Sequence, residues 1–196
     1  MYLSLTKSHS IRISIKFLIW LFVLLIAIPV MYFSAKILQR HIYPMQYADI
    51  VTEMANEYNL SPSLVFAVIH TESKFDKNAL SSADAKGLMQ ITDDTFRWAL
   101  KKAGQKELHP DNLYVPKTNI QYGCYILTLL NEQFDNMETS LAAYNAGQGR
   151  VREWLNNPDY SQDGVTLTNI PYEETATYVR RVLTVQKRYQ QIYNIQ

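Results

Sequence analysis

Apolar residues follow two different patterns along this chain. Residues 17–35 form one continuous apolar stretch without a charged side chain, flanked by Lys16 and Lys36. A helix of this length extends about 28 Å, which is close to the hydrocarbon thickness of a bilayer. We therefore predict a transmembrane anchor over residues 17–35, preceded by a short basic cytoplasmic tail over residues 1–16.

Two other kinds of leading segment fit the sequence less well. A signal peptide is cleaved after small residues, whereas Phe33 stands two positions before Ala35. No cysteine follows the stretch closely, which argues against a lipoprotein anchor. Basic residues are slightly more frequent before the stretch than after it (Lys7, Arg12 and Lys16 against Lys36 and Arg40). Positive charge favours the cytoplasmic side, so we expect the rest of the protein to lie outside the cytoplasm.

Beyond a linker over residues 36–44, apolar residues recur at helical spacing through residues 45–196. Helix-start residues and helix-end glycines divide this region (Ser61-Pro62, Thr92, Pro116 and Pro171; Gly104 and Gly147). Residues 165–170 are rich in β-branched side chains and are predicted to form either a strand or an extended loop. The pattern indicates a single, mostly α domain over residues 45–196.

Charge and composition exclude several classes of function. Residues 1–40 carry five basic and no acidic residues, whereas residues 41–196 carry 14 basic and 18 acidic residues. An acidic body does not suit a nucleic-acid backbone, so we expect no nucleic-acid partner. The only cysteine, Cys124, lies in an apolar helical pattern and is predicted to be a core residue. The four histidines share no ligand spacing, so neither a metal site nor a cofactor is expected.

Glu72 is the strongest candidate for chemistry. It follows the apolar helix that Ser61 and Pro62 begin, and burial there would raise its pKa. A carboxyl that stays protonated near neutral pH can donate a proton to a leaving oxygen, as cleavage of a glycosidic bond requires. The simpler interpretation is a turn cap or an ion pair with Lys74 or Lys77.

Four segments place this residue in a wider pattern. They comprise Glu72-Ser73-Lys74-Phe75 with Gly87-Leu88-Met89-Gln90; Asn119-Ile120 with Gly123 and Tyr125; Ala142-Ala143-Tyr144-Asn145-Ala146-Gly147; and Ile170-Pro171-Tyr172-Glu173-Glu174-Thr175 with Tyr178-Val179. In this order, over roughly residues 60–185, the chain resembles the lytic transglycosylases of the soluble-Slt type, relatives of goose-type lysozyme.

The resemblance implies a lysozyme-like catalytic domain of the α+β superfamily that acts on peptidoglycan. Glu72 would first be the acid and then the base in non-hydrolytic cleavage between N-acetylmuramic acid (MurNAc) and N-acetylglucosamine (GlcNAc), which leaves 1,6-anhydroMurNAc ends. Further positions match the substrate-binding residues of the family (Ser73, Ser81, Met89, Gln90, Tyr144, Asn145, Glu174 and Tyr178).

Each of these residues also has a simpler interpretation. Ser73 and Ser81 could be solvated turn residues, and Met89 could only fill the core. Tyr144 and Tyr178 could pack with a hydrated hydroxyl. For Glu173, beside Glu174, we expect stabilisation of the helix dipole rather than a place in the site.

Two residues depart from the family pattern. Asp84 stands where the family usually has glycine, and near the scissile bond it could hold a water molecule and make the enzyme a hydrolase. Asp93 stands where proline is common at the next helix start, and we expect no functional change from it.

The sequence therefore predicts a single-pass protein of the bacterial cell membrane with an extracytoplasmic lytic transglycosylase domain. Its predicted partners are peptidoglycan glycan strands and the membrane, and no particular envelope-complex protein is indicated. The alternatives are a goose-lysozyme-like hydrolytic muramidase and a non-catalytic glycan-binding scaffold.

Overall fold

The computed structural model describes residues 15–105 and 108–195 and divides the chain into two compact units that meet between Ile42 and Tyr43. The described part of the first unit is one helix, α1 (Ile15–Ile42), with Pro29 inside it and no buried residue. Its length and composition are those of a membrane-spanning helix. The helix extends past the predicted span of 17–35 into residues that we assigned to a linker, and the boundaries of the span itself stay a prediction.

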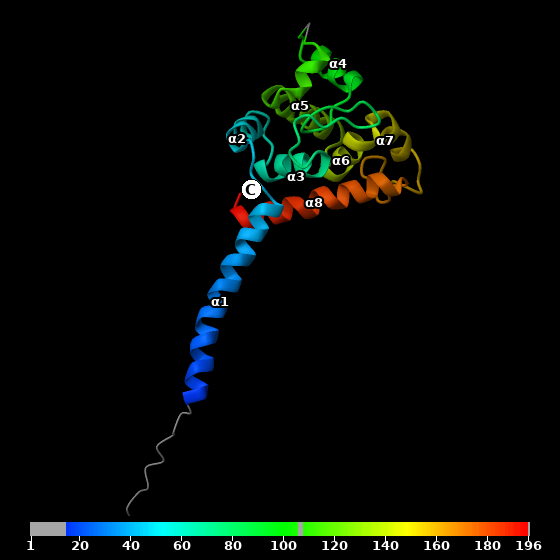
Figure 1. Ribbon diagram of the computed structural model, residues 1–196. Helices are drawn as coiled ribbons and strands as arrows, with labels where there is room; N and C mark the ends of the chain where they lie inside the picture. Colours follow the sequence, from blue (N-terminus) through cyan, green and yellow to red (C-terminus); the bar gives the residue numbers. More distant parts are fainter. Residues whose placement is uncertain (1–14, 106–107, 196) are drawn as a thin grey trace, which may run out of the picture. The chain divides into compact units, whose positions relative to one another are not determined.

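The second unit, which we call the body, is built from helices (Figure 1). They are α2 (Ala48–Glu57), α3 (Pro62–Glu72), α4 (Asp93–Lys102), the 3-10 helix η1 (Pro110–Tyr114), α5 (Pro116–Phe134), α6 (Met137–Ala146), α7 (Gln148–Leu155) and α8 (Glu173–Tyr193). The described residues contain isolated β-bridges at Leu80–Lys86 and Lys86–Ile91 but no strand. Residues 165–170 form a loop, so the mostly α prediction is confirmed.

Local side-chain contacts explain where several helices begin and end. Ser61 Oγ accepts from the Leu64 amide at 3.4 Å, and Thr92 Oγ1 accepts from the Thr95 amide at 3.3 Å, as their N-cap positions predict. Gly147, at φ 89°, separates α6 from α7 by a backbone conformation that favours glycine. Thus the chain turns sharply between these two helices.

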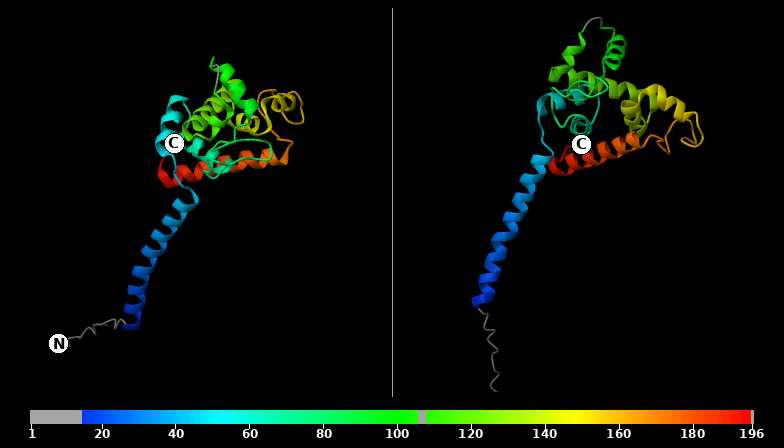
Figure 2. Two further views of the ribbon diagram at one scale, coloured as in Figure 1. Left: turned by 45° about the horizontal axis from the view of Figure 1, so that its top comes forward. Right: turned by 45° about the vertical axis from the view of Figure 1, so that its right-hand side comes forward.

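The core of the body surrounds α3. Every residue from Ser63 to Ile69 is buried, as expected for a helix that is apolar all round. The long helix α8 packs along α3 and forms one side of the body, whereas α4 lies on the opposite side (Figures 1 and 2). Cys124 is fully buried on α5, and burial raises the pKa of its thiol to about 12, which confirms a core role.

Candidate active site

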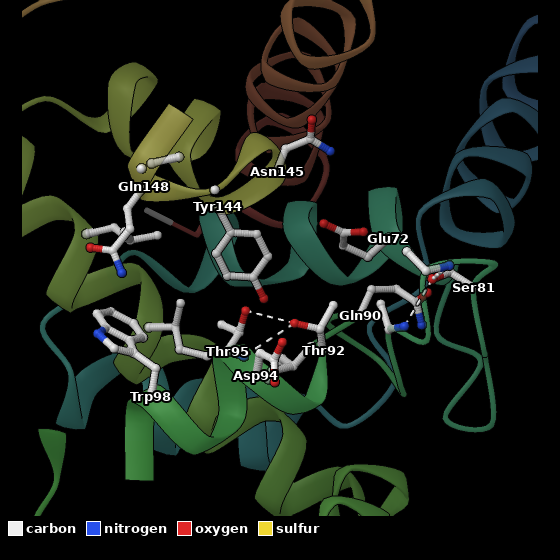
Figure 3. Close-up of a pocket in the computed structure, with 18 of the residues that line it drawn as sticks. Glu72, Ser81, Gln90, Thr92, Asp94, Thr95, Trp98, Tyr144, Asn145 and Gln148 are labelled. Carbon is white, nitrogen blue, oxygen red and sulfur yellow. Dashed lines mark hydrogen bonds between the residues drawn. The ribbon is translucent and has the colours of Figure 1, made fainter. Parts of the chain in front are cut away.

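A cleft of about 640 Å³ opens on the body, lined by the end of α3, the loop between α3 and α4, α4 itself, and the junction of α6 and α7. Figure 3 shows Ser81 and Gln90 near Glu72 at one end, and Trp98 and Gln148 at the other. We call these the Glu72 end (Glu72, Ser81 and Gln90) and the Trp98 end (Trp98 and Gln148).

The chain immediately after Glu72 is held by specific contacts. Ser73 Oγ donates to the carbonyl oxygen of Ile69 at 3.2 Å and to that of Leu88 at 2.8 Å. Phe75 takes a left-handed φ of 69°, which a bulky residue adopts only at a cost. Burial of its ring, which is 4% exposed, offsets that cost. α3 therefore ends at a defined place, with Glu72 at the wall of the cleft.

The carboxyl of Glu72 is partly buried. Burial raises its pKa to about 7, and the nearby hydroxyl of Tyr178 lowers it by a smaller amount. That hydroxyl is buried without a well-aligned hydrogen-bond partner among the described residues. Burial, and then the charge of Glu72, raise the pKa of Tyr178 well above its usual value, so it remains neutral. A carboxyl with a pKa near 7 is protonated in a large share of molecules at neutral pH and can act as an acid.

Tyr144 reaches from α6 to the loop beneath the cleft. Its hydroxyl donates to the carbonyl oxygen of Met89 at 2.8 Å. Burial, and then the charge of Glu72, raise the pKa of Tyr144 well above its usual value. The Met89 side chain is buried against Gly123, where an added Cβ would lie 2.1 Å from the Met89 sulfur. Met89 thus contributes its backbone to the support of the cleft and its side chain to the core.

Asn119 holds the same loop from α5. Its side chain is fully buried, and Nδ2 donates to the carbonyl oxygens of Lys86 at 2.9 Å and Leu113 at 2.8 Å. Its Oδ1 accepts from the Met89 amide at 2.7 Å. Gly87, at φ 72°, passes so close that a Cβ would lie 2.4 Å from Asn119 Nδ2. This buried amide therefore sets the position of the loop that supports Tyr144.

Ser81 and Gln90 present polar groups at the Glu72 end. Ser81 Oγ accepts from backbone amides of its own turn, including that of Ala85 at 3.1 Å. Gln90 Nε2 donates to the carbonyl oxygens of Gly87 at 2.9 Å and Ala79 at 3.2 Å. Both side chains line the cleft, and these bonds fix their orientation there.

The α6–α7 junction and the start of α8 complete the lining. Asn145 Oδ1 accepts from Thr175 Oγ1 at 2.8 Å, which fixes the amide at the rim of the cleft. Glu174 also lines the cleft and is exposed to solvent. Glu173 points elsewhere and pairs with Arg180 at 2.8 Å, outside the lining.

Comparison with known proteins assigns this arrangement to a family. Residues 49–165, more than half of the chain, match the transglycosylase SLT domain. This chain belongs to the SLT transglycosylase family. The soluble lytic murein transglycosylase of Salmonella typhimurium is 35% identical over 150 residues, which cover 75% of this chain and 23% of that protein. The membrane-bound lytic murein transglycosylase C of Actinobacillus pleuropneumoniae serotype 5b is 28% identical over 184 residues, covering 82% and 50%.

Solved structures agree with this assignment. The lytic transglycosylase Slt of Pseudomonas aeruginosa superposes with a TM-score of 0.67 at 32% identity, covering 78% of this chain and 25% of that one. The 70 kDa soluble lytic transglycosylase of Escherichia coli gives 0.69 at 30%, with the same coverage. The lysozyme-like fold is thereby confirmed. The chain spans half or less of the length of these relatives.

Within this SLT domain, the predicted site residues fall into two groups. Six line the cleft, namely Glu72, Ser81, Gln90, Tyr144, Asn145 and Glu174. Ser73, Met89 and Tyr178 lie outside the lining: Met89 accepts a hydrogen bond from Tyr144, Tyr178 lies beside Glu72, and Ser73 bonds to the backbone of Ile69 and Leu88. Their roles toward a substrate stay predictions.

The sequence motifs did not predict that α4 contributes to the lining of the cleft. Thr92, Thr95 and Trp98 line the side of the SLT cleft opposite Tyr144, and Gln148 of α7 lies near Trp98 (Figure 3). The sequence did contain an indication that α4 meets the cleft, because Trp98 lies opposite the buried face of this amphipathic helix. A large aromatic residue that is only partly buried, outside the fully buried face of its helix, often marks a binding surface.

The two departures from the family pattern have structural explanations. Asp84 adopts φ 64°, where glycine is more favourable, and its side chain is exposed outside the lining of the cleft. Asp93 does more than stabilise the start of α4, because it forms an ion pair with Lys86, which is 8% exposed. The hydrogen bond that Lys86 donates to the Asp93 carboxylate raises the pKa of Lys86 and joins α4 to the loop beside Glu72.

Among residues 15–105 and 108–195, no group of three His, Cys, Asp or Glu side chains is placed to hold a metal ion. Two exposed carboxylates, Asp94 and Glu174, line the cleft together with Glu72. Glu72 is the carboxyl whose pKa burial raises toward neutrality. The arrangement can therefore supply one proton donor to a bound polar ligand.

Proposed function

We propose that this protein is a peptidoglycan lytic transglycosylase anchored to the bacterial cell membrane. It would cleave the β-1,4 bond between MurNAc and GlcNAc without water and leave a 1,6-anhydroMurNAc end. The relatives named above are lytic murein transglycosylases, and the cleft of this chain has the chemistry that such a reaction needs.

One observation carries the proposal: Glu72 lies in the cleft wall with a pKa raised to about 7 by burial. In the first step, the protonated carboxyl gives its proton to the glycosidic oxygen, and the bond from that oxygen to the anomeric carbon of MurNAc breaks. The acetamido oxygen of MurNAc attacks the same carbon, so that no protein nucleophile is required. GlcNAc leaves with a free 4-hydroxyl.

In the second step, Glu72 is ionised and acts as a base. It takes the proton of the 6-hydroxyl of MurNAc, whose oxygen attacks the anomeric carbon and displaces the acetamido oxygen. The 1,6-anhydro ring closes, and Glu72 is protonated again. A pKa close to the working pH suits both steps, because the group must give and then accept a proton.

The other cleft residues have roles that suit a saccharide. Ser81, Gln90 and Asn145 present hydroxyl and amide groups to sugar hydroxyls and N-acetyl groups. The ring of Trp98 supplies an apolar face for a sugar ring at the far end. Tyr144 and Tyr178, whose pKa values are raised, supply neutral phenols around Glu72.

The location that we propose is supported by α1 and by the relatives. We propose that α1 crosses the membrane once and holds the body on the extracytoplasmic side, where peptidoglycan lies. The apolar composition of α1 and the membrane-bound homologue support this arrangement. Reaction of single cysteines introduced before and after α1 with an impermeant reagent tests the topology, in a Cys124→Ala background.

Analysis of the products tests the reaction. The full chain, purified in detergent, is incubated with peptidoglycan, and the muropeptides are identified by mass spectrometry. We expect anhydro ends, which are lighter by one water than hydrolysis products. Reducing ends without anhydro sugar would identify a muramidase instead, and intact strands would favour a glycan-binding scaffold.

A further inference from the structure

A second hollow of about 510 Å³ lies beside the Trp98 end of the cleft and shares Trp98 and Gln148 with it. Beyond this shared wall, α4 contributes Lys102 and α7 contributes Arg152, each four positions after the shared residue. Residues four apart lie on the same face of a helix, about 6 Å apart along its axis. The two cations therefore stand one helical turn beyond the cleft.

The side chains of this hollow are arranged to bind anionic groups. Arg152 Nη2 donates to Gln133 Oε1 at 2.8 Å and to Gln148 Oε1 at 3.1 Å. These bonds orient the guanidinium, and its other N–H groups remain able to donate. Lys102 forms no ion pair within the described part of the chain. The acidic side chain of Glu132 completes the charged lining.

The two positive charges of this hollow contrast with the net negative charge of the body. Residues 41–196 carry 14 basic and 18 acidic residues, a net charge of −4. A hollow with two cations and one anion, joined to the proposed glycan cleft, is suited to a ligand that carries more carboxylates than amines. The remaining N–H groups of Arg152 and the ammonium group of Lys102 can each donate a charge-assisted hydrogen bond to a carboxylate oxygen.

We propose that this second hollow binds the peptide stem of the peptidoglycan strand through its carboxylates. The assignment rests on the proposed function, because the stem branches from the lactyl group of a MurNAc residue in the strand. An extended peptide covers about 3.5 Å per residue, so a few residues carry a stem past the wall formed by Trp98 and Gln148. Lys102 and Arg152 then bind stem carboxylates, and Glu132 accepts from the free amine of a diamino acid.

Two substrates separate a stem site from a sugar site. One is native peptidoglycan, and the other is the same glycan after an amidase has removed the stems. For the double variant Lys102→Gln/Arg152→Gln, we expect the KM for native strands to rise about three- to tenfold, with little change in kcat. On stem-free strands, the variant and the wild-type protein should have the same KM.

A matched control removes two positive charges elsewhere. Lys101 and Arg181 are exposed on α4 and α8 and line neither hollow. Lys101→Gln/Arg181→Gln should leave both KM values unchanged, so an equal rise in both double variants would point to net charge and overturn the proposal. An equal rise on native and stem-free strands would assign the hollow to sugar, and no rise at all would also reject a stem site.

Binding measured without turnover keeps this proposal separate from the proposed reaction. In the Glu72→Gln background, the Kd for soluble stem-bearing and stem-free glycan fragments is measured by calorimetry. We expect the Lys102→Gln/Arg152→Gln change to weaken only the stem-bearing complex. This outcome would support the stem site even if the products showed that the reaction is hydrolysis, and equal weakening of both complexes would overturn it.

Discussion

The two ends of the cleft use ionisable groups in opposite ways. At the Glu72 end, the carboxyl is partly buried and its pKa rises to about 7, beside two neutral phenols. Beyond the Trp98 end, Lys102 and Arg152 are basic side chains that are exposed to solvent. Proton transfer needs a group whose charge can change near neutral pH, whereas recognition of an anion needs a charge that does not. The burial of Glu72 thus suits one end to proton transfer, and the exposure of Lys102 and Arg152 suits the other end to recognition of an anion.

The largest expected effect comes from removing the carboxyl at the Glu72 end. Glu72→Gln keeps the shape of the side chain but can neither give nor accept a proton, so we expect turnover of peptidoglycan to fall by about 10²- to 10⁴-fold. Release of soluble muropeptides measures the rate. Glu174→Gln is the matched control, because it removes an exposed carboxylate from the same cleft. A loss with Glu174→Gln as large as with Glu72→Gln would contradict a role for burial.

The second prediction concerns the rigid support of the Glu72 end. Asn119→Ala removes three buried hydrogen bonds and leaves the Met89 amide and the Leu113 carbonyl oxygen unsatisfied, whereas the Lys86 carbonyl oxygen keeps its bond from the Ile91 amide. Each unsatisfied group costs about 1–3 kcal/mol, so we expect the free energy of unfolding to fall by about 2 kcal/mol or more. Chemical denaturation measures the change. Asn112→Ala, in the 3-10 helix η1, is the control, because the side-chain hydrogen bond that it removes is exposed to solvent, and it should lower stability by less than about 1 kcal/mol.

The third prediction uses the pKa of Glu72. Its folded value of about 7 lies above the ordinary 4.5, so between these pH values the unfolded chain releases a proton that the folded protein keeps. The unfolded state binds fewer protons there, and stability falls as pH rises from about 4.5 to about 7. The expected fall from this group is about 2–3 kcal/mol.

Glu72→Gln should remove this part of the pH dependence, because a glutamine does not titrate. Above pH 7 the variant should be more stable than the wild-type protein by about the same 2–3 kcal/mol, although we expect its turnover to be much lower. Denaturation curves at pH 4.5 and pH 7.5 test this. Equal stability of the two proteins at pH 7.5 would show that Glu72 has an ordinary pKa and would remove the contrast between the ends.

Much of the body could be predicted from local sequence. α3 was clear because Ser61 and Pro62 mark its start and an apolar run follows, and the motif around Glu72 indicated the acid. The 3-10 helix over residues 110–114 was not predicted, because five residues carry too little periodicity. Likewise, the helical period showed which face of α4 enters the core, but not that Thr95 and Trp98 on its other side meet the cleft.

Contacts between distant segments explain the remaining differences. Asn119 belonged to a recognised segment, yet its bond to the Met89 amide joins residues 30 positions apart. The pairing of Lys86 with Asp93 depends on how the loop after α3 returns to α4. Arg152 on α7 meets Gln133, 19 positions earlier near the end of α5, only because the chain turns back through α6. Such contacts depend on the packed fold, and helical spacing within one segment does not predict them.

The smallest expected effect tests whether the Glu72 end needs any second acid. Asp84 is exposed outside the cleft lining at φ 64°, so Asp84→Gly should relieve backbone strain and stabilise the body by about 0.5–1 kcal/mol. The products should keep the same type of end, because the carboxylate that is lost lies outside the lining of the cleft. Thermal unfolding and mass spectrometry of muropeptides measure both quantities on one preparation. A change in the ratio of anhydro to reducing ends would place Asp84 in the reaction, and the chemistry of the Glu72 end would then no longer depend on one buried carboxyl.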